Sequence, residues 1–208
     1  MDLNYLCTEV LSAQDAQLHS QIRFYDPDTP WIEQPNIART LHTLLSALYA
    51  AHSGLMGSVD MLLARGMNVN ATGGRFGSVL QAAACKGYTE VVEVLLAKGA
   101  DVNLAGGDYG DPLQGACSYG HRECAKLLLE HGAEVNARGG EHNTALHTAA
   151  FNGYDQVAAL LLENGAEIDP LDEEHRTPLI WVAGEGHPIT VKLLLDRGAN
   201  CMVQDESD

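Results

Sequence analysis

The sequence predicts an all-α solenoid of about five stacked helix–turn–helix units with short finger loops and an N-terminal helical cap. Two observations lead to this prediction. The segment VLLAKGADVNLAGG, residues 94–107, recurs with few changes as LLLEHGAEVNARGG, residues 127–140, which is 33 positions later. Glycine also recurs at positions 66, 99, 132, 165 and 198, each time after a leucine-rich run. A fixed period of this length is typical of solenoids, whose units bury their apolar faces only by stacking.

The N-terminal part departs from the repeat. Residues 1–44 are predicted to form the helical cap, which includes the proline-broken connector DPDTPWIEQP at 26–35. Apolar residues at helical spacing predict one long helix that runs to Gly54; they are Ile37, Leu41, Leu44, Leu45 and Leu48. The five units are then expected at about 45–77, 78–110, 111–143, 144–176 and 177–208.

The same local signals return in each unit from residue 78 onward. Ser78, Asp111, Thr144 and Thr177 are predicted N-caps of a short first helix. The glycines at 87, 120, 153 and 186 end that helix. An apolar stripe such as Val91, Val92 and Leu95 predicts the second helix, which ends at the next glycine of the 33-residue series. The last unit keeps an apolar second helix, TVKLLLDRG, whose outer side either faces water or packs against a second copy.

Two phrases carry a resemblance to a known family. One is LLAKGADVN and its four counterparts; the other is SVLQAAACKGY, DPLQGACSYGH, TALHTAAFNGY and TPLIWVAGEGH. A 33-residue unit with both phrases resembles the ankyrin repeat, over about residues 45–205. The paired glycines in ATGGRFGS, LAGGDYGD and ARGGEHNT are similar to a variant common in fungal ankyrin proteins. The resemblance implies a concave groove and finger loops that bind other proteins.

The composition of the chain limits the classes of binding partner and the cellular location that we expect. The chain has 28 acidic and 12 basic side chains, for a net charge of −16, so nucleic acid is an unfavourable partner and a basic protein surface a favourable one. No apolar run reaches the ~18 residues of a membrane span, and MDLNYLCTEV is unlike a signal peptide. Five cysteines without CxxC spacing indicate reduced thiols. We expect an intracellular, cytoplasmic protein, with the nucleus as an alternative, and no membrane partner.

The resemblance places the groove at the variable positions of the first helices and at the finger tips. The candidates are Tyr49, His52, Arg75, Phe76, Lys86, Asp108, Tyr109, Ser118, Tyr119, Glu141, His142, Phe151, Asn152, His175, Trp181 and Glu185. Small residues at Ala82, Gly115 and Thr148 predict a hollow in mid-groove, walled by Tyr109, Tyr119 and Phe151.

Neither a metal nor a cofactor is expected. The glycine-rich segments GGRFG and GEGHPI fall on the turns of the repeat and lack the strand-to-helix context of a phosphate loop. Cys117, His121 and Cys124 have residue types that bind metals, but His121 stands where the repeat places a structural histidine. A structural role is therefore predicted for all three.

Two main functions fit these patterns. The first is a non-catalytic protein–protein interaction module. The second is a groove for a small organic molecule, or a cofactor-independent cyclase or isomerase; its acid–base groups would come from His142, His175, Tyr119, Lys86, Asp108 and Glu185. A third possibility is that the chain is part of a larger multidomain protein.

Overall fold

A computed structural model describes residues 47–73 and 75–202. The predicted cap, residues 1–44, lies outside these residues. The complete helices of the described part are α4 (Met56–Ala64), α5 (Val79–Lys86), α6 (Thr89–Ala97), α7 (Pro112–Ser118), α8 (Arg122–Glu130), α9 (Ala145–Phe151), α10 (Asp155–Glu163), α11 (Pro178–Glu185) and α12 (Pro188–Asp196). Before them, residues 47–52 are helical and lead into a turn at Gly54.

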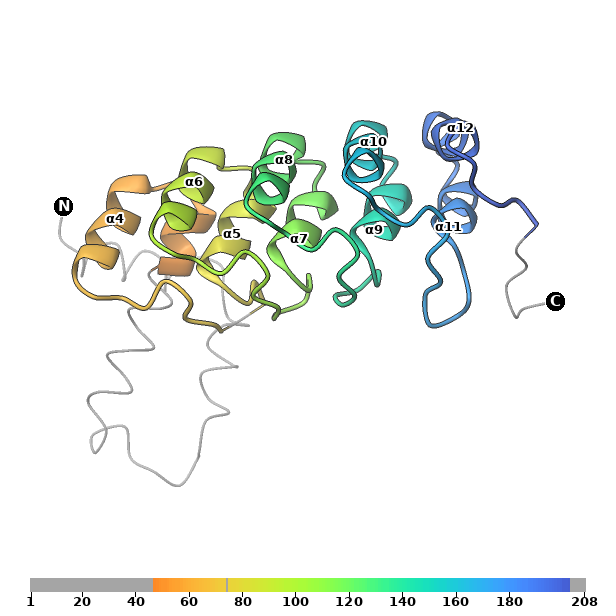
Figure 1. The fold of residues 1–208 in the computed structure, drawn as a ribbon. Helices are drawn as coiled ribbons and strands as arrows, with labels where there is room; N and C mark the ends of the chain where they lie inside the picture. Colours follow the sequence, from red (N-terminus) through yellow and green to blue (C-terminus); the bar gives the residue numbers. More distant parts are fainter. Residues whose placement is uncertain (1–46, 74, 203–208) are drawn as a thin grey trace, which may run out of the picture.

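The helices form two layers. Figure 1 shows α4, α6, α8, α10 and α12 in one layer and α5, α7, α9 and α11 in the other, with the finger loops projecting beside the second layer. Within the described residues no regular strand is present, and one isolated bridge joins Thr72 and Ser78. The predicted all-α solenoid is therefore confirmed.

Local side-chain chemistry begins the first helix of each unit. Ser78, Asp111, Thr144 and Thr177 each accept a hydrogen bond from the backbone N–H three residues ahead, as predicted. At Asp111 the Gln114 side chain also bonds back to the cap backbone, which completes a capping box. These caps fix where each first helix starts, and so fix the direction in which the preceding finger projects.

Glycine is needed where successive units touch. Gly87 has φ +73°, and a methyl group on it would lie 2.5 Å from the His121 ring of the next unit. The same relation holds between Gly153 and the His187 ring. His121 Nε2 lies 3.1 Å from the Cys85 carbonyl oxygen, and His187 Nε2 lies 3.1 Å from the Phe151 carbonyl oxygen. His121 thus has a structural role, because its ring nitrogen contacts a carbonyl oxygen of the preceding unit.

A ladder of amides ties the bases of the fingers together. Asn103 Nδ2 donates to the Gly132 carbonyl at 3.1 Å, and its Oδ1 accepts from Glu134 N at 2.9 Å. Asn70 and Asn136 make the equivalent pairs of bonds one unit earlier and one unit later. This ladder sets the register between units and therefore the spacing of the fingers.

The apolar core runs along the interface between the two layers. Leu80, Leu95, Leu113, Leu128, Leu146, Leu161 and Leu194 are fully buried. On α12, in the last unit, Ile189 is 69% and Leu195 45% exposed in the single chain.

Candidate functional site

Each finger is closed by one backbone hydrogen bond across five residues. The bonds run from Gly73 N to Gly77 O, Gly106 N to Gly110 O, Gly139 N to Asn143 O, and Asp172 N to Arg176 O, at 2.7 to 3.1 Å. A methyl group on Gly107 would overlap the Arg75 carbonyl oxygen of the preceding finger. That oxygen accepts a bond from Asp108 N at 2.8 Å. The paired glycines therefore let neighbouring fingers lie against each other and bring their tips together.

A continuous group of rings runs over the first two fingers and the ends of the helices beside them. The ring centroids lie 4.8 Å apart for His52–Phe76, 6.0 Å for Phe76–Tyr109 and 5.7 Å for Tyr109–Tyr119. Two cations cover these rings: the Arg75 guanidinium is 5.5 Å from the Phe76 ring, and Lys86 Nζ is 5.7 Å from the Tyr119 ring. We call Arg75, Phe76, Lys86, Tyr109 and Tyr119 the Arg75 cluster.

A chain of hydrogen bonds orders the Arg75 cluster. Arg75 Nη2 donates to Tyr109 Oη at 2.8 Å, and the two phenol oxygens of Tyr109 and Tyr119 are 2.6 Å apart. Burial of the phenol, followed by its hydrogen bond with Tyr109, raises the pKa of Tyr119. The hydrogen bond to Tyr109 raises the pKa of Arg75. At neutral pH the Tyr119 phenol is protonated and the Arg75 guanidinium is charged, so the cluster offers donors to a ligand.

A second group of rings lies on the third, fourth and fifth units. Ring centroids are 4.7 Å apart for His142–Phe151, 5.3 Å for His142–Trp181 and 5.2 Å for Phe151–Trp181. The Arg176 guanidinium lies 4.4 Å from the Trp181 ring. We call His142, Phe151, Arg176 and Trp181 the Trp181 cluster.

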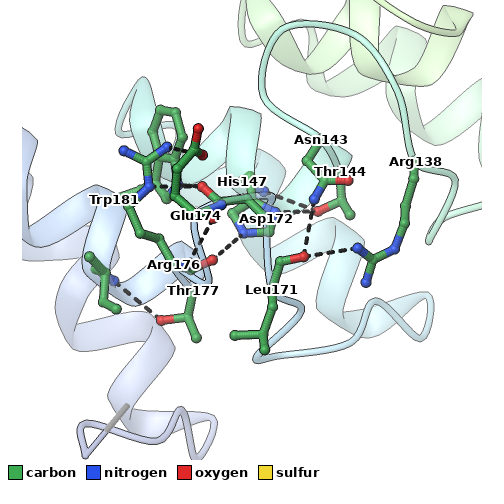
Figure 2. Close-up of polar contacts among 11 residues, drawn as sticks. Arg138, Asn143, Thr144, His147, Leu171, Asp172, Glu174, Arg176, Thr177 and Trp181 are labelled. Carbon is green, nitrogen blue, oxygen red and sulfur yellow. Dashed lines mark hydrogen bonds and ion pairs between the residues drawn. The ribbon is translucent and has the colours of Figure 1, made fainter. Parts of the chain in front are cut away.

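One carboxylate holds the Trp181 cluster in place. Asp172 Oδ1 accepts from the backbone N–H of Glu174 and of Arg176, at 3.0 and 2.7 Å, while Oδ2 accepts from Arg176 Nε at 2.9 Å and Trp181 Nε1 at 2.8 Å (Figure 2). Burial pushes the pKa of Asp172 upward, but the hydrogen bonds from Arg176 and Trp181 outweigh it and keep the pKa below its ordinary value. Asp172 is therefore ionised and fixes the indole and guanidinium planes.

The comparison with known families decides the identity of the fold. A family model described as ankyrin repeats, in three copies, matches residues 47–139 and 134–205. The chain is an ankyrin repeat protein. No curated protein matches it. Its ankyrin units make it a protein-interaction module in the general sense. No helix of the described residues is long and apolar enough to cross a membrane.

His142 stands out within the ankyrin fingers because of its unpaired nitrogen. Its Nδ1 is buried and has no hydrogen-bond partner in the described residues. Burial lowers the pKa of His142, so the ring is neutral at physiological pH. His147, by contrast, contacts Thr144 Oγ1 and the Arg176 carbonyl oxygen, and joins finger four to the stack. His142 thus packs as an aromatic ring.

The other predicted residues of the ankyrin groove are placed as follows. Tyr49, Glu141, His175 and Glu185 are exposed. Ser118 and Asn152 donate to carbonyl oxygens one turn back in their own helices, Ser118 to Gln114 O and Asn152 to Thr148 O. The acid–base candidates are divided, since Tyr119, Lys86 and Asp108 lie at the Arg75 cluster and His142 belongs to the Trp181 cluster.

The predicted mid-groove hollow is wrong. Ala82 is fully buried and Thr148 is 4% exposed, and a methyl group on Gly115 would lie 2.8 Å from Cys85 Sγ. The small side chains exist because adjacent first helices approach closely there. Within the described residues no group of His, Cys, Asp and Glu is arranged to hold a metal ion.

Sequence reasoning missed Asp172, Arg176 and Arg138. Arg138 Nη1 and Asn143 Nδ2 both donate to the Leu171 carbonyl, at 2.8 and 3.1 Å, and so attach the base of finger four to finger three (Figure 2). A signal was present in the repeat: Asp172 stands where the three earlier fingers have glycine at 73, 106 and 139. An acid at a position that otherwise needs no side chain indicates a local structural role.

Proposed function

We propose that this ankyrin repeat protein is a non-catalytic module that binds a protein partner along its fingers and first helices. The observation that carries the proposal is the pair of aromatic clusters, each built on three successive units and each partly open to solvent. Tyrosine, tryptophan and arginine dominate the energetics of protein interfaces. Tyr119 is 40% exposed and Trp181 is half-buried, so both have contact area left for a partner.

Preorganisation supports binding by these side chains. An immobilised side chain costs about 0.5–1.5 kcal/mol when it orders on association. Tyr119 is already held by Tyr109, and Trp181 by Asp172, before any partner arrives. The clusters therefore bring contact area with a small ordering cost.

The charge of the chain favours a basic surface on the partner. A net charge of −16 accelerates association with a cationic protein and slows association with nucleic acid. We place this interaction inside the cell, in the cytoplasm or nucleus.

Small-molecule binding or acid–base catalysis is the less supported alternative. A cyclase or isomerase needs its acid and base on one substrate, whereas Tyr119 and His142 belong to different clusters. The elevated pKa of Tyr119 also makes its phenolate costly to form at neutral pH.

The proposal is tested by selecting displayed random peptides of about 12 residues on the full chain. We expect enriched peptides whose binding is weakened at least about tenfold by Trp181→Ala or Tyr119→Ala, which is about 1.4 kcal/mol. Ile189→Ala is the matched control, because it shortens an exposed apolar side chain on α12, in the layer away from the fingers (Figure 1). Peptides that bind all three variants as they bind the wild type contradict the proposal.

A further inference from the structure

The two clusters differ in the sign of the charges around them. Arg75 and Lys86 are exposed beside the Tyr119 ring in a protein with a strong excess of acid. Toward the C-terminus three exposed acids lie near the groove, Glu141, Glu174 and Glu185. One exposed cation lies among these fingers, Arg138, which donates to the Leu171 carbonyl oxygen. Arg176 is already engaged by Asp172 and Glu174, at 2.9 and 2.8 Å. The groove is therefore electrically polar along its length.

The cations of the Arg75 cluster can exchange their present ion-pair partner for a ligand. Arg75 Nε lies 3.9 Å from Asp108 Oδ2, with the two side chains 52% and 64% exposed. An exposed pair at this distance contributes little stability and is readily replaced. Arg75 and Lys86 carry two positive charges and the neighbouring Asp108 one negative charge, so one net positive charge remains at the groove surface.

The phenols leave one hydrogen-bond donor for a ligand. Tyr109 Oη accepts from Arg75, and one phenol hydrogen lies between the two oxygens 2.6 Å apart. Two phenols carry two hydrogens, so the second has no acceptor among the described residues. When Tyr109 donates to Tyr119, the spare O–H belongs to the 40% exposed Tyr119. Donation along the chain from Arg75 polarises this last O–H and strengthens it as a donor.

A spare phenol donor flanked by one net positive charge suits a singly charged oxygen acceptor. Hydrogen bonds from phenol and guanidinium donors to a carboxylate are short and strong. A phosphate dianion fits less well, because its second charge would be unbalanced at this cluster and repelled by the field of the whole protein.

We propose that the Arg75 cluster is a carboxylate subsite that takes an Asp or Glu side chain of the protein partner. The subsite rests on the proposed function and refines it: the bound segment is acidic where it meets Tyr119 and basic where it meets Glu141, Glu174 and Glu185. Tyr119 follows α7 and Trp181 lies on α11, two helix spacings of about 10 Å away. An extended chain covers this distance in about six residues. The acidic and basic positions of the segment are thus about six residues apart.

The experiment repeats the peptide selection on wild type and on the double variant Arg75→Gln/Lys86→Gln. The wild type enriches peptides with an Asp or Glu about six residues from a Lys or Arg. The double variant loses the acidic preference and keeps the basic one. Arg122→Gln/Lys126→Gln on α8 is the control, because it removes the same charge in the other helix layer and leaves both preferences intact (Figure 1).

One selected peptide then gives the quantitative test by calorimetry. Replacing its acidic residue by Gln weakens binding to the wild type about tenfold or more and changes binding to the Arg75→Gln/Lys86→Gln variant less than twofold. Unchanged circular dichroism shows that the variant is folded.

The outcomes separate the two proposals. Peptides that depend on Trp181 but carry no preferred acid overturn the carboxylate subsite and leave the proposed function standing. Tighter binding of a phosphotyrosine peptide than of its Glu form also overturns the carboxylate assignment. Failure to enrich any peptide that depends on Trp181 or Tyr119 overturns the proposed function and the subsite together.

Discussion

Asp172→Asn tests how finger four and the Trp181 cluster are held together. The Asp172 side chain is 4% exposed and accepts four hydrogen bonds. Asparagine has the same shape, so its oxygen keeps the two backbone donors of Glu174 and Arg176. Its NH₂ group replaces Oδ2 and faces Arg176 Nε–H and Trp181 Nε1–H, which are both donors. The substitution therefore removes two bonds and one charge without leaving a cavity.

The expected loss of folding stability follows from the two lost hydrogen bonds. A hydrogen bond to a charged group contributes about 1.5–3 kcal/mol, and a buried donor left unpaired costs about 1–3 kcal/mol. Arg176 is one-third exposed and recovers part of its loss from water, while the Trp181 N–H is more enclosed. We expect the free energy of unfolding to fall by about 2–4 kcal/mol, and the melting temperature by about 5–15 °C.

Urea unfolding followed by Trp181 fluorescence measures this loss of stability. The Trp31→Phe substitution is made in both proteins, so that all tryptophan fluorescence comes from Trp181. Glu173→Gln is the control, because it removes the same charge from an exposed neighbour and should change stability by less than about 0.5 kcal/mol. The folded-state pKa of Asp172 is depressed, so its stabilisation is present above about pH 3.9 and is lost as the pH falls through the folded pKa. An Asn variant as stable as wild type at pH 7, with unchanged emission, refutes the reasoning.

Four further substitutions test the packing. His142→Phe should leave stability unchanged or raise it by about 1 kcal/mol, because it removes the orphaned nitrogen and keeps the ring; a loss above about 1 kcal/mol in thermal unfolding contradicts this. Burial lowers the pKa of His147, so the free energy of unfolding of the wild type should fall as the pH drops below about 6.5. The two preceding units have glutamine at this position. His147→Gln should therefore reduce the pH dependence measured by urea unfolding at pH 5–7. Gly115→Ala should destabilise the protein by about 1–2 kcal/mol, because the added methyl group would lie 2.8 Å from Cys85 Sγ. Gly184→Ala should stabilise it by about 0.5–1 kcal/mol, because a methyl group there would have nothing within 4 Å. Equal melting temperatures of the two variants refute this reasoning.

Most of the fold was predictable because its signals are local. A cap such as Thr144 bonds to a backbone N–H three residues away. A turn glycine such as Gly87 needs only its own positive φ and the neighbouring ring. Such features repeat every 33 residues, so one correct interpretation applies to each unit. The amide ladder could not be predicted in the same way, since Asn103 and Glu134 meet across 31 residues.

The site was predictable in its residue types and not in its geometry. The variable positions of the repeat identified Tyr119 and Trp181, which the structure places in two ring clusters. The hollow was wrong because the size of Gly115 says nothing about what fills the space beside it, which here is Cys85. Asp172 was missed because its only signal is a departure from the glycine at 73, 106 and 139. Its role depends on partners at 174, 176 and 181 that only the folded finger brings together.

The departure at Asp172 also explains why the groove has two unlike halves. Between the first two fingers Gly107 lets Arg75 and Asp108 come into backbone contact, and the tips then stack as Phe76 on Tyr109. At finger four an acid replaces the glycine and draws Arg176 inward, so this arginine pairs with Asp172 and Glu174 instead of facing a partner, and the three side chains keep one net negative charge. The cation on the first fingers stays exposed and the cation on the last does not. A difference in one repeat position thus gives a uniform scaffold two unlike ends, and we expect the proposed mixed-charge segment to bind it in one orientation.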